Sequence, residues 1–82
     1  MPTNLYLYST SHCHLCETAI ALILQLAKAH KFKMIELKIV EIADNEKLLA
    51  RYGLTIPVLQ RQDTFAELNW PFSEADVVEF IK

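Results

Sequence analysis

Both cysteines of this 82-residue chain lie in one short segment, between an apolar run and a helical pattern. Residues 11–16 read Ser-His-Cys-His-Leu-Cys, so Cys13 and Cys16 have the spacing C-x-x-C. The run before them, residues 4–8, is apolar or amphipathic on both faces, which is typical of a central strand covered on both sides. From residue 15 to residue 30, apolar side chains recur at helical spacing and predict a long helix. The two thiols are therefore expected where a strand turns into a helix.

This position favours thiol chemistry. Cysteines three residues apart lie on one face of a helical turn, within reach of a disulfide. The first N–H groups of a helix lack intrahelical acceptors, and the helix dipole adds partial positive charge, so a thiolate is stabilised there. We expect Cys13 to be the exposed thiol, and Cys16 to point toward the apolar side with Ile20 and Ile23. The implied reaction is attack by Cys13 on a substrate disulfide, after which Cys16 resolves the mixed disulfide.

Three other interpretations of the cysteine pair stay open. A stabilising disulfide across about four residues would contribute only about 2 kcal/mol, whereas a staple usually joins distant segments. Two buried, inert cysteines are a second possibility. The third is a metal or cluster site, because residues 12–16 hold four ligand types: His12, Cys13, His14 and Cys16. Three of these are adjacent in sequence, while a closed tetrahedral site usually draws on two separated pairs, so a site shared across a dimer would be needed.

The histidines beside the thiols have two interpretations. His12 and His14 are either exposed residues of the loop and first turn, or part of the binding site for the substrate. A partly protonated imidazole next to Cys13 would favour the thiolate further. Glu17 would oppose this effect if it lies close.

Composition excludes several classes of function. The net charge of −2 gives no indication of nucleic-acid binding, and the single glycine, Gly53, excludes a glycine-rich phosphate loop. No stretch reaches the roughly 18 apolar residues of a membrane span, and no signal-peptide pattern opens the chain. We therefore expect no membrane association and a cytoplasmic location, where a disulfide is usually transient and catalytic. The length predicts one domain, residues 1–82, which we expect to be a monomer.

The rest of the chain completes the order β-α-β-α-β-β-α. Leu24 widens the apolar face of the first helix, which we therefore expect to be well buried, and Thr10 and Ser11 are its candidate hydroxyl caps. A strand over residues 33–42 follows, parallel to the first because a helical crossover joins them. Asp44 is the candidate N-cap of a second helix over residues 45–52.

Gly53 is expected to close that helix in the left-handed conformation. Residues 54–59 then predict a third strand, residues 60–63 a turn, and residues 64–68 a fourth strand. Ser73 is the expected cap of the last helix, with Asp76 as its capping-box partner. The order predicts an α/β fold with a four-stranded mixed sheet and helices on both faces.

These features resemble a minimal thioredoxin/glutaredoxin fold. The resemblance rests on the C-x-x-C after the first strand, a Tyr-Gly-Leu-x-Ile-Pro-Val segment about 40 residues on, and the order of elements. The CHLC motif, Thr-Ile-Pro-Val and the Trp-Pro-Phe before the last helix resemble the short bacterial glutaredoxin-like proteins. That resemblance implies a dithiol–disulfide oxidoreductase in which Cys13 is the nucleophile and Cys16 the resolving cysteine. It also implies that Pro57 is a cis-proline beside the C-x-x-C, that the Ile56 main chain pairs with an extended substrate, and that Thr55 matches the threonine of the glutaredoxin Thr-Val-Pro segment.

The sequence departs from glutaredoxins at two places. Glutaredoxins usually have a lysine just before the first cysteine, whereas residues 10–12 here read Thr-Ser-His. They also have a Gly-Gly pair that admits glutathione before the last helix, and residues 67–71 contain no glycine. A glutathione site is therefore not carried over, and we expect no cofactor besides the Cys13–Cys16 disulfide.

The expected partners are a protein or small-molecule disulfide and a reductase or thiol that donates electrons. Trp70 either forms a wall over the active site for a protein substrate or packs under the last helix. The alternative function is a binding module or a metal or cluster carrier that uses the His12–Cys16 segment.

Overall fold

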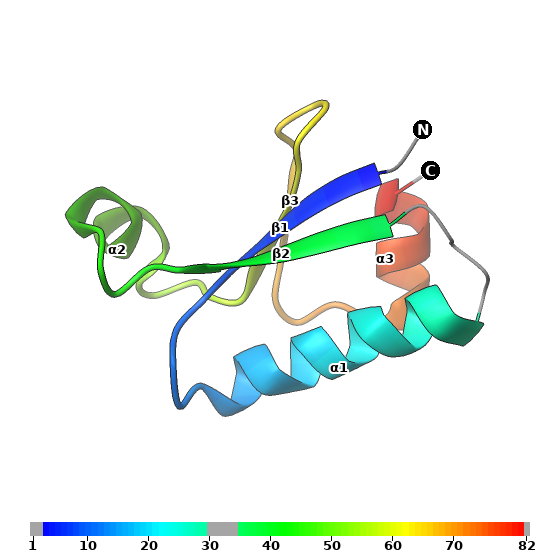
Figure 1. Cartoon of the computed structure of the whole chain (residues 1–82), viewed down its shortest axis with the longest axis horizontal. Coiled ribbons are helices and arrows are strands. Elements are labelled where there is room, and N and C mark those ends of the chain that lie inside the picture. Colours follow the sequence, from blue (N-terminus) through cyan, green and yellow to red (C-terminus); the bar gives the residue numbers. More distant parts are fainter. Residues whose placement is uncertain (1–2, 30–34, 82) are drawn as a thin grey trace.

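A computed structural model describes residues 3–29 and 35–81 of the chain (Figure 1). The predicted order of elements is confirmed: β1 (Thr3–Ser9), α1 (His14–Ala29), β2 (Ile35–Glu41), α2 (Glu46–Tyr52), β3 (Val58–Arg61), β4 (Glu67–Asn69) and α3 (Glu74–Ile81). The predicted end of the first helix at His30 and the predicted start of the second strand at residues 33–34 lie outside the described residues. None of the helices within the described ranges is long and apolar enough to span a bilayer.

The four strands form one mixed sheet in the order β2-β1-β3-β4. β1 pairs in parallel with β2 and antiparallel with β3, and β4 pairs antiparallel with β3. The parallel pair follows from the helical crossover between β1 and β2, and the antiparallel pair β3–β4 from a short turn. β1 is thus a central strand, as its apolar side chains on both faces predict.

Alternate residues of β1 enter two separate clusters. Leu5 and Leu7 are fully buried in the larger cluster, with side chains from α1 and α3. Tyr8 faces the other side and packs with Tyr52 of α2 and with Val58. In Figure 1, α1 and α3 lie on the same side of the sheet, and α2 lies beyond the end where β1 and β2 finish. The predicted α/β fold with helices on both faces is therefore correct.

Several predicted details are wrong. Leu24 is 55% exposed, so the outer side of α1 is open to solvent although Ile23 and Leu26 are buried. Residues 54–57 are not part of a strand, and β3 instead continues through Gln60 and Arg61, which were expected in the turn. Pairing explains the shift, because these two residues lie opposite Tyr6 and Leu5 of β1. β4 correspondingly begins at Glu67 rather than at residue 64.

The helix ends also differ in part from the predictions. Ser73 and Asp76 form the expected capping box, with N···O distances of 2.8 and 3.2 Å. The N-cap of α2 is Asn45 rather than Asp44, because its side-chain oxygen accepts from two N–H groups of the first turn. Gly53 has φ −54° and is not left-handed. A glycine suits this position because a Cβ would lie 2.5 Å from the Leu49 carbonyl oxygen.

Candidate active site

One end of the sheet brings together the segments in which the candidate residues lie. β1 ends at Ser9, opposite Glu41 at the end of β2. On the other side of β1, Tyr8 is opposite Val58, the first residue of β3. Val58 is also opposite Asn69, the last residue of β4. The loop that leads to the cysteines, the segment that ends in Pro57 and the segment that begins with Trp70 therefore leave the sheet at the same end.

Cys13 occupies the N-cap position of α1. Its carbonyl oxygen accepts from Glu17 N at 3.0 Å, and its Sγ accepts from Cys16 N at 3.2 Å. The cap was expected to be Thr10 or Ser11, but the thiol takes the place of a capping hydroxyl and the Ser11 hydroxyl donates to Glu41 instead. The Cys13 sulfur is thus held at the positive end of the helix dipole, and the residue is only partly buried.

Cys16 lies on the inner side of the same turn. Both cysteines are free, and Cys16 is 1% exposed, on the apolar side as the sequence predicts. Burial, and to a lesser extent a hydrogen bond with the Cys13 sulfur, raise the pKa of the Cys16 thiol to about 11. Cys16 is therefore a neutral thiol near pH 7, and Cys13 is the more exposed of the two cysteines.

Glu41 fixes the loop between β1 and the cysteines. One carboxylate oxygen accepts from both the N–H and the hydroxyl of Ser11, at 3.1 Å each, and the other accepts from Ala43 N at 3.1 Å. The hydrogen bond from Ala43 N has the largest effect, and together these bonds hold the pKa of Glu41 below its usual value. The side chain is therefore an anion. The sequence analysis missed Glu41 because its role depends on the register of β2 against β1.

Pro57 and Trp70 are joined through their main chains. The Ile56–Pro57 bond is cis, as the resemblance implies, and Pro57 is buried. Trp70 N donates to Pro57 O at 3.2 Å, and the Trp70–Pro71 bond is also cis. The indole of Trp70 packs edge-on against Phe72, with ring centroids 5.0 Å apart, at the border of the larger core cluster. Trp70 thus contacts the core, and its role as a wall for a protein substrate stays a prediction.

Thr55 and Ile56 are tied back to the end of α2. Thr55 N and Ile56 N donate to Tyr52 O at 2.9 and 3.0 Å, and the Thr55 hydroxyl reaches the same oxygen at 3.4 Å. The Ile56 N–H is therefore engaged within the chain. The Ile56 carbonyl accepts no hydrogen bond from residues 3–29 or 35–81.

Comparison with known proteins assigns the chain to a family. The family model described as Glutaredoxin-like domain (DUF836) matches residues 4–82. The chain belongs to this glutaredoxin-like family. A search of the curated proteins finds no match.

Solved structures agree with the family assignment. A structural-genomics target protein from X. campestris is 34% identical, with a TM-score of 0.76 over 93% of this chain and 92% of that one. A protein from Nitrosomonas europaea is 30% identical, with a TM-score of 0.81 over 100% and 94% of the two chains. Thioredoxin O2 from Arabidopsis thaliana in its oxidised state is 15% identical, with a TM-score of 0.65 over 96% and 71%, and shows the fold alone. The protein is thus a glutaredoxin-like domain of thioredoxin fold with two cysteines close together.

The histidines of this glutaredoxin-like site are both exposed, and His12 lines a hollow that also contains Cys16. His12 is exposed and has φ 61°, a backbone conformation that is uncommon for a residue with a Cβ. The His14 side chain is 98% exposed, and its Nδ1 lies 3.6 Å from a Glu17 carboxylate oxygen. Within the described ranges, no three His, Cys, Asp or Glu side chains are grouped so that they could hold a metal ion.

Proposed function

We propose that this glutaredoxin-like protein is a dithiol–disulfide oxidoreductase, with Cys13 as nucleophile and Cys16 as resolving cysteine. The observation that carries the proposal is the asymmetry of the two thiols. The Cys13 sulfur is accessible and accepts an N–H at the start of α1, whereas Cys16 is buried beside it as a neutral thiol. An accessible attacking sulfur and a sheltered second thiol are what a two-step exchange requires.

The reaction balances within the chain and the substrate. The Cys13 thiolate attacks one sulfur of a substrate disulfide, the S–S bond breaks, and the first substrate thiolate leaves and takes up a proton. Cys16 then loses its proton and attacks the Cys13 sulfur of the mixed disulfide, which releases the second substrate thiolate. Two electrons pass to the substrate, and the Cys13–Cys16 disulfide remains.

The resolving step should be controlled by the proton on Cys16. In the mixed disulfide Cys13 has no free thiol, but burial still raises the pKa of Cys16 above its ordinary 9.0. Since only the thiolate attacks, the rate of resolution should rise about tenfold per pH unit between about pH 6 and pH 8. A mixed disulfide formed in acid and then brought to each pH, with the products counted by mass spectrometry, gives this rate. A rate that levels off below neutral pH would show that Cys16 is not the protonated thiol described above.

The charges beside the thiols support a donor other than glutathione. A hollow of about 260 Å³ lies next to Cys16, and its lining includes Glu17, Glu41, Ile20 and Ile39. The described residues around it include no lysine or arginine, although glutathione carries two carboxylates. We therefore propose as partners a protein or low-molecular-weight disulfide and a reductase or thiol donor without net negative charge. A cytoplasmic location belongs to the same proposal, since the chain has only one pair of cysteines, spaced C-x-x-C, whereas the expected monomer stays a prediction.

The alternative of a metal carrier or binding module has weaker support. Such a site would draw on the histidines beside the thiols, and although His12 lines the hollow next to Cys16, His14 lies against Glu17. A structural staple is also disfavoured, because both cysteines belong to one helical turn that hydrogen bonds and burial already fix.

The test is a single-turnover reaction that needs no electron donor. The protein is reduced, freed of reductant and mixed with an excess of bis(hydroxyethyl) disulfide. We expect each protein molecule to lose both thiols and release two substrate thiols, with a Cys13–Cys16 disulfide found by mass spectrometry. Protein that keeps both thiols under these conditions, or forms only stable mixed disulfides, would overturn the proposal.

A further inference from the structure

Tyr52 connects the segment before Pro57 to three other parts of the fold. It is the last residue of α2 and only 4% exposed. The last carbonyl groups of a helix have no intrahelical partners, and the Tyr52 carbonyl takes its hydrogen bonds from Thr55 and Ile56. The main chain on which a substrate strand would pair is therefore tied to the end of α2 through the Tyr52 carbonyl, in addition to the hydrogen bond from Trp70 N to Pro57 O.

The ring of Tyr52 has an aromatic and a cationic neighbour. It is stacked on the ring of Tyr8, with centroids 4.2 Å apart and an angle of 14° between the planes. The Arg51 guanidinium carbon lies 5.4 Å from the Tyr52 centroid. Tyr8 immediately precedes Ser9, the last residue of β1, so the stack joins the segment before Pro57 to the strand that leads to the cysteines.

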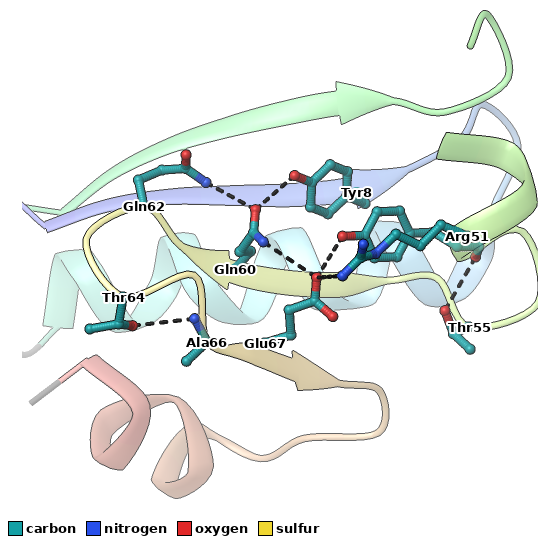
Figure 2. Close-up of polar contacts among 9 residues, drawn as sticks. Tyr8, Arg51, Thr55, Gln60, Gln62, Thr64, Ala66 and Glu67 are labelled. Atoms are coloured by element: carbon teal, nitrogen blue, oxygen red, sulfur yellow. Dashed lines mark hydrogen bonds and ion pairs between the residues drawn. The ribbon is translucent and has the colours of Figure 1, made fainter. Parts of the chain in front are cut away.

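The Tyr52 hydroxyl belongs to a network of side-chain hydrogen bonds. It donates to a Glu67 carboxylate oxygen at 2.5 Å, and the same oxygen accepts from Gln60 at 3.4 Å and lies 3.7 Å from Arg51. Gln60 in turn accepts from the Tyr8 hydroxyl at 2.7 Å. Figure 2 shows Tyr8, Gln60, Glu67 and Arg51 close together in front of the sheet, with Thr55 on the chain segment to the right. Residues from β1, β3, β4 and α2 therefore fix this one ring.

We infer that Tyr52 is the positioning residue for substrate pairing: its ring and hydroxyl, held by Tyr8 and Glu67, set where its carbonyl places the Ile56 main chain. The inference rests on the proposed oxidoreductase function and adds to it. Because Tyr52 occupies the Ile56 N–H, the group offered to the substrate is the Ile56 carbonyl. A polypeptide disulfide with a free main-chain N–H beside its cysteine fits this acceptor, whereas a disulfide without a peptide backbone gains nothing from it.

The test compares Tyr52→Phe with the wild-type protein on two substrates. Each pre-reduced protein is mixed with increasing concentrations of a peptide that carries one disulfide between extended segments, and separately with bis(hydroxyethyl) disulfide. Phenylalanine keeps the stack but loses the hydrogen bond to Glu67. We expect the half-saturating peptide concentration to rise about tenfold with little change in the maximal rate, because the loss of one positioning hydrogen bond to a charged group has this size. The rate with bis(hydroxyethyl) disulfide should not change.

Variants at Glu67 test the same hydrogen bond from the side of its acceptor. Glu67→Gln keeps an oxygen that can accept from Tyr52 and should retain most peptide binding, whereas Glu67→Ala should match Tyr52→Phe. The double variant Tyr52→Phe/Glu67→Ala should be no worse than either single variant, because both remove the same bond. Asp63→Asn is the matched control, since it weakens a carboxylate pair with Arg61, at 2.6 Å, in the β3–β4 turn.

The outcomes separate this inference from the proposed function. Wild-type protein that reduces neither disulfide defeats the proposed function, and the role of Tyr52 falls with it. Wild-type protein that reduces both, together with Tyr52→Phe and Glu67→Ala proteins that lose the two activities equally or lose neither, would overturn the inference alone. If the Asp63→Asn protein also loses peptide reduction selectively, the effect does not depend on the Tyr52–Glu67 hydrogen bond, and the inference is overturned.

Discussion

Replacement of Cys13 by serine is expected to abolish disulfide reduction. A hydroxyl in place of the accessible sulfur can still cap α1 but cannot attack a disulfide at neutral pH, so no mixed disulfide forms. The rate of thiol release should fall about a thousandfold or more, which is the scale seen when a nucleophile is removed. Single-turnover kinetics with a chromogenic disulfide, on protein whose fold is checked by circular dichroism, provides the measurement.

Thr18→Ala is the matched control for this variant. Thr18 is exposed on α1, and its hydroxyl donates to the His14 carbonyl at 3.0 Å. Its loss removes a contact of the same turn without touching a sulfur, so the rate should stay within about twofold. A Cys13→Ser protein that keeps most of the wild-type rate would identify Cys16 or another group as the nucleophile.

Replacement of Cys16 by serine is expected to stop the reaction half-way. The first attack needs only the Cys13 sulfur, whereas release of the second substrate thiol needs the buried one. The variant should therefore accumulate a mixed disulfide on Cys13 and release one substrate thiol per protein instead of two. Intact-protein mass spectrometry in acid shows the added mass, and peptide mapping shows the residue that carries it.

Cys16→Ala serves as the companion to this variant. Serine buries a hydroxyl where Cys16 is 1% exposed, while alanine leaves a small cavity but no polar atom. Both should trap the same mixed disulfide if the function of Cys16 is resolution. A variant that carries no mixed disulfide and instead forms an intermolecular Cys13–Cys13 disulfide, still with one thiol released per protein, would mean that a second protein molecule can resolve the intermediate in place of Cys16.

The sequence was sufficient for the order of elements because the local patterns agree with one another. Leu5 and Leu7 on one face of β1 and Tyr6 and Tyr8 on the other predicted a central strand, and the structure places them in two clusters on opposite sides of the sheet. The capping box of Ser73 needs only residues three apart, and it was predicted correctly. Short-range geometry of this kind is fixed by neighbouring residues alone.

Details that depend on distant parts of the chain could not be predicted. Glu41 acts on the loop before the cysteines only because β2 pairs with β1 in a register that puts Glu41 opposite Ser9. Tyr52 and Glu67 are fifteen residues apart, and their hydrogen bond depends on where α2 and β4 lie in the fold. The exposure of Leu24 has the same origin, since a wide apolar face does not reveal how much of it the remaining helices cover.

The measurement that tests the account most directly is the reduction potential of the Cys13–Cys16 pair. The protein is equilibrated in buffers of graded glutathione and dithiothreitol potential, and the two redox forms are counted by mass spectrometry after acid quenching. A reversible two-electron transition between about −270 and −200 mV is predicted, the range of thioredoxin-like and glutaredoxin-like dithiols. A disulfide that never forms in these buffers, or one that resists reduction to below about −300 mV like a structural staple, would contradict it.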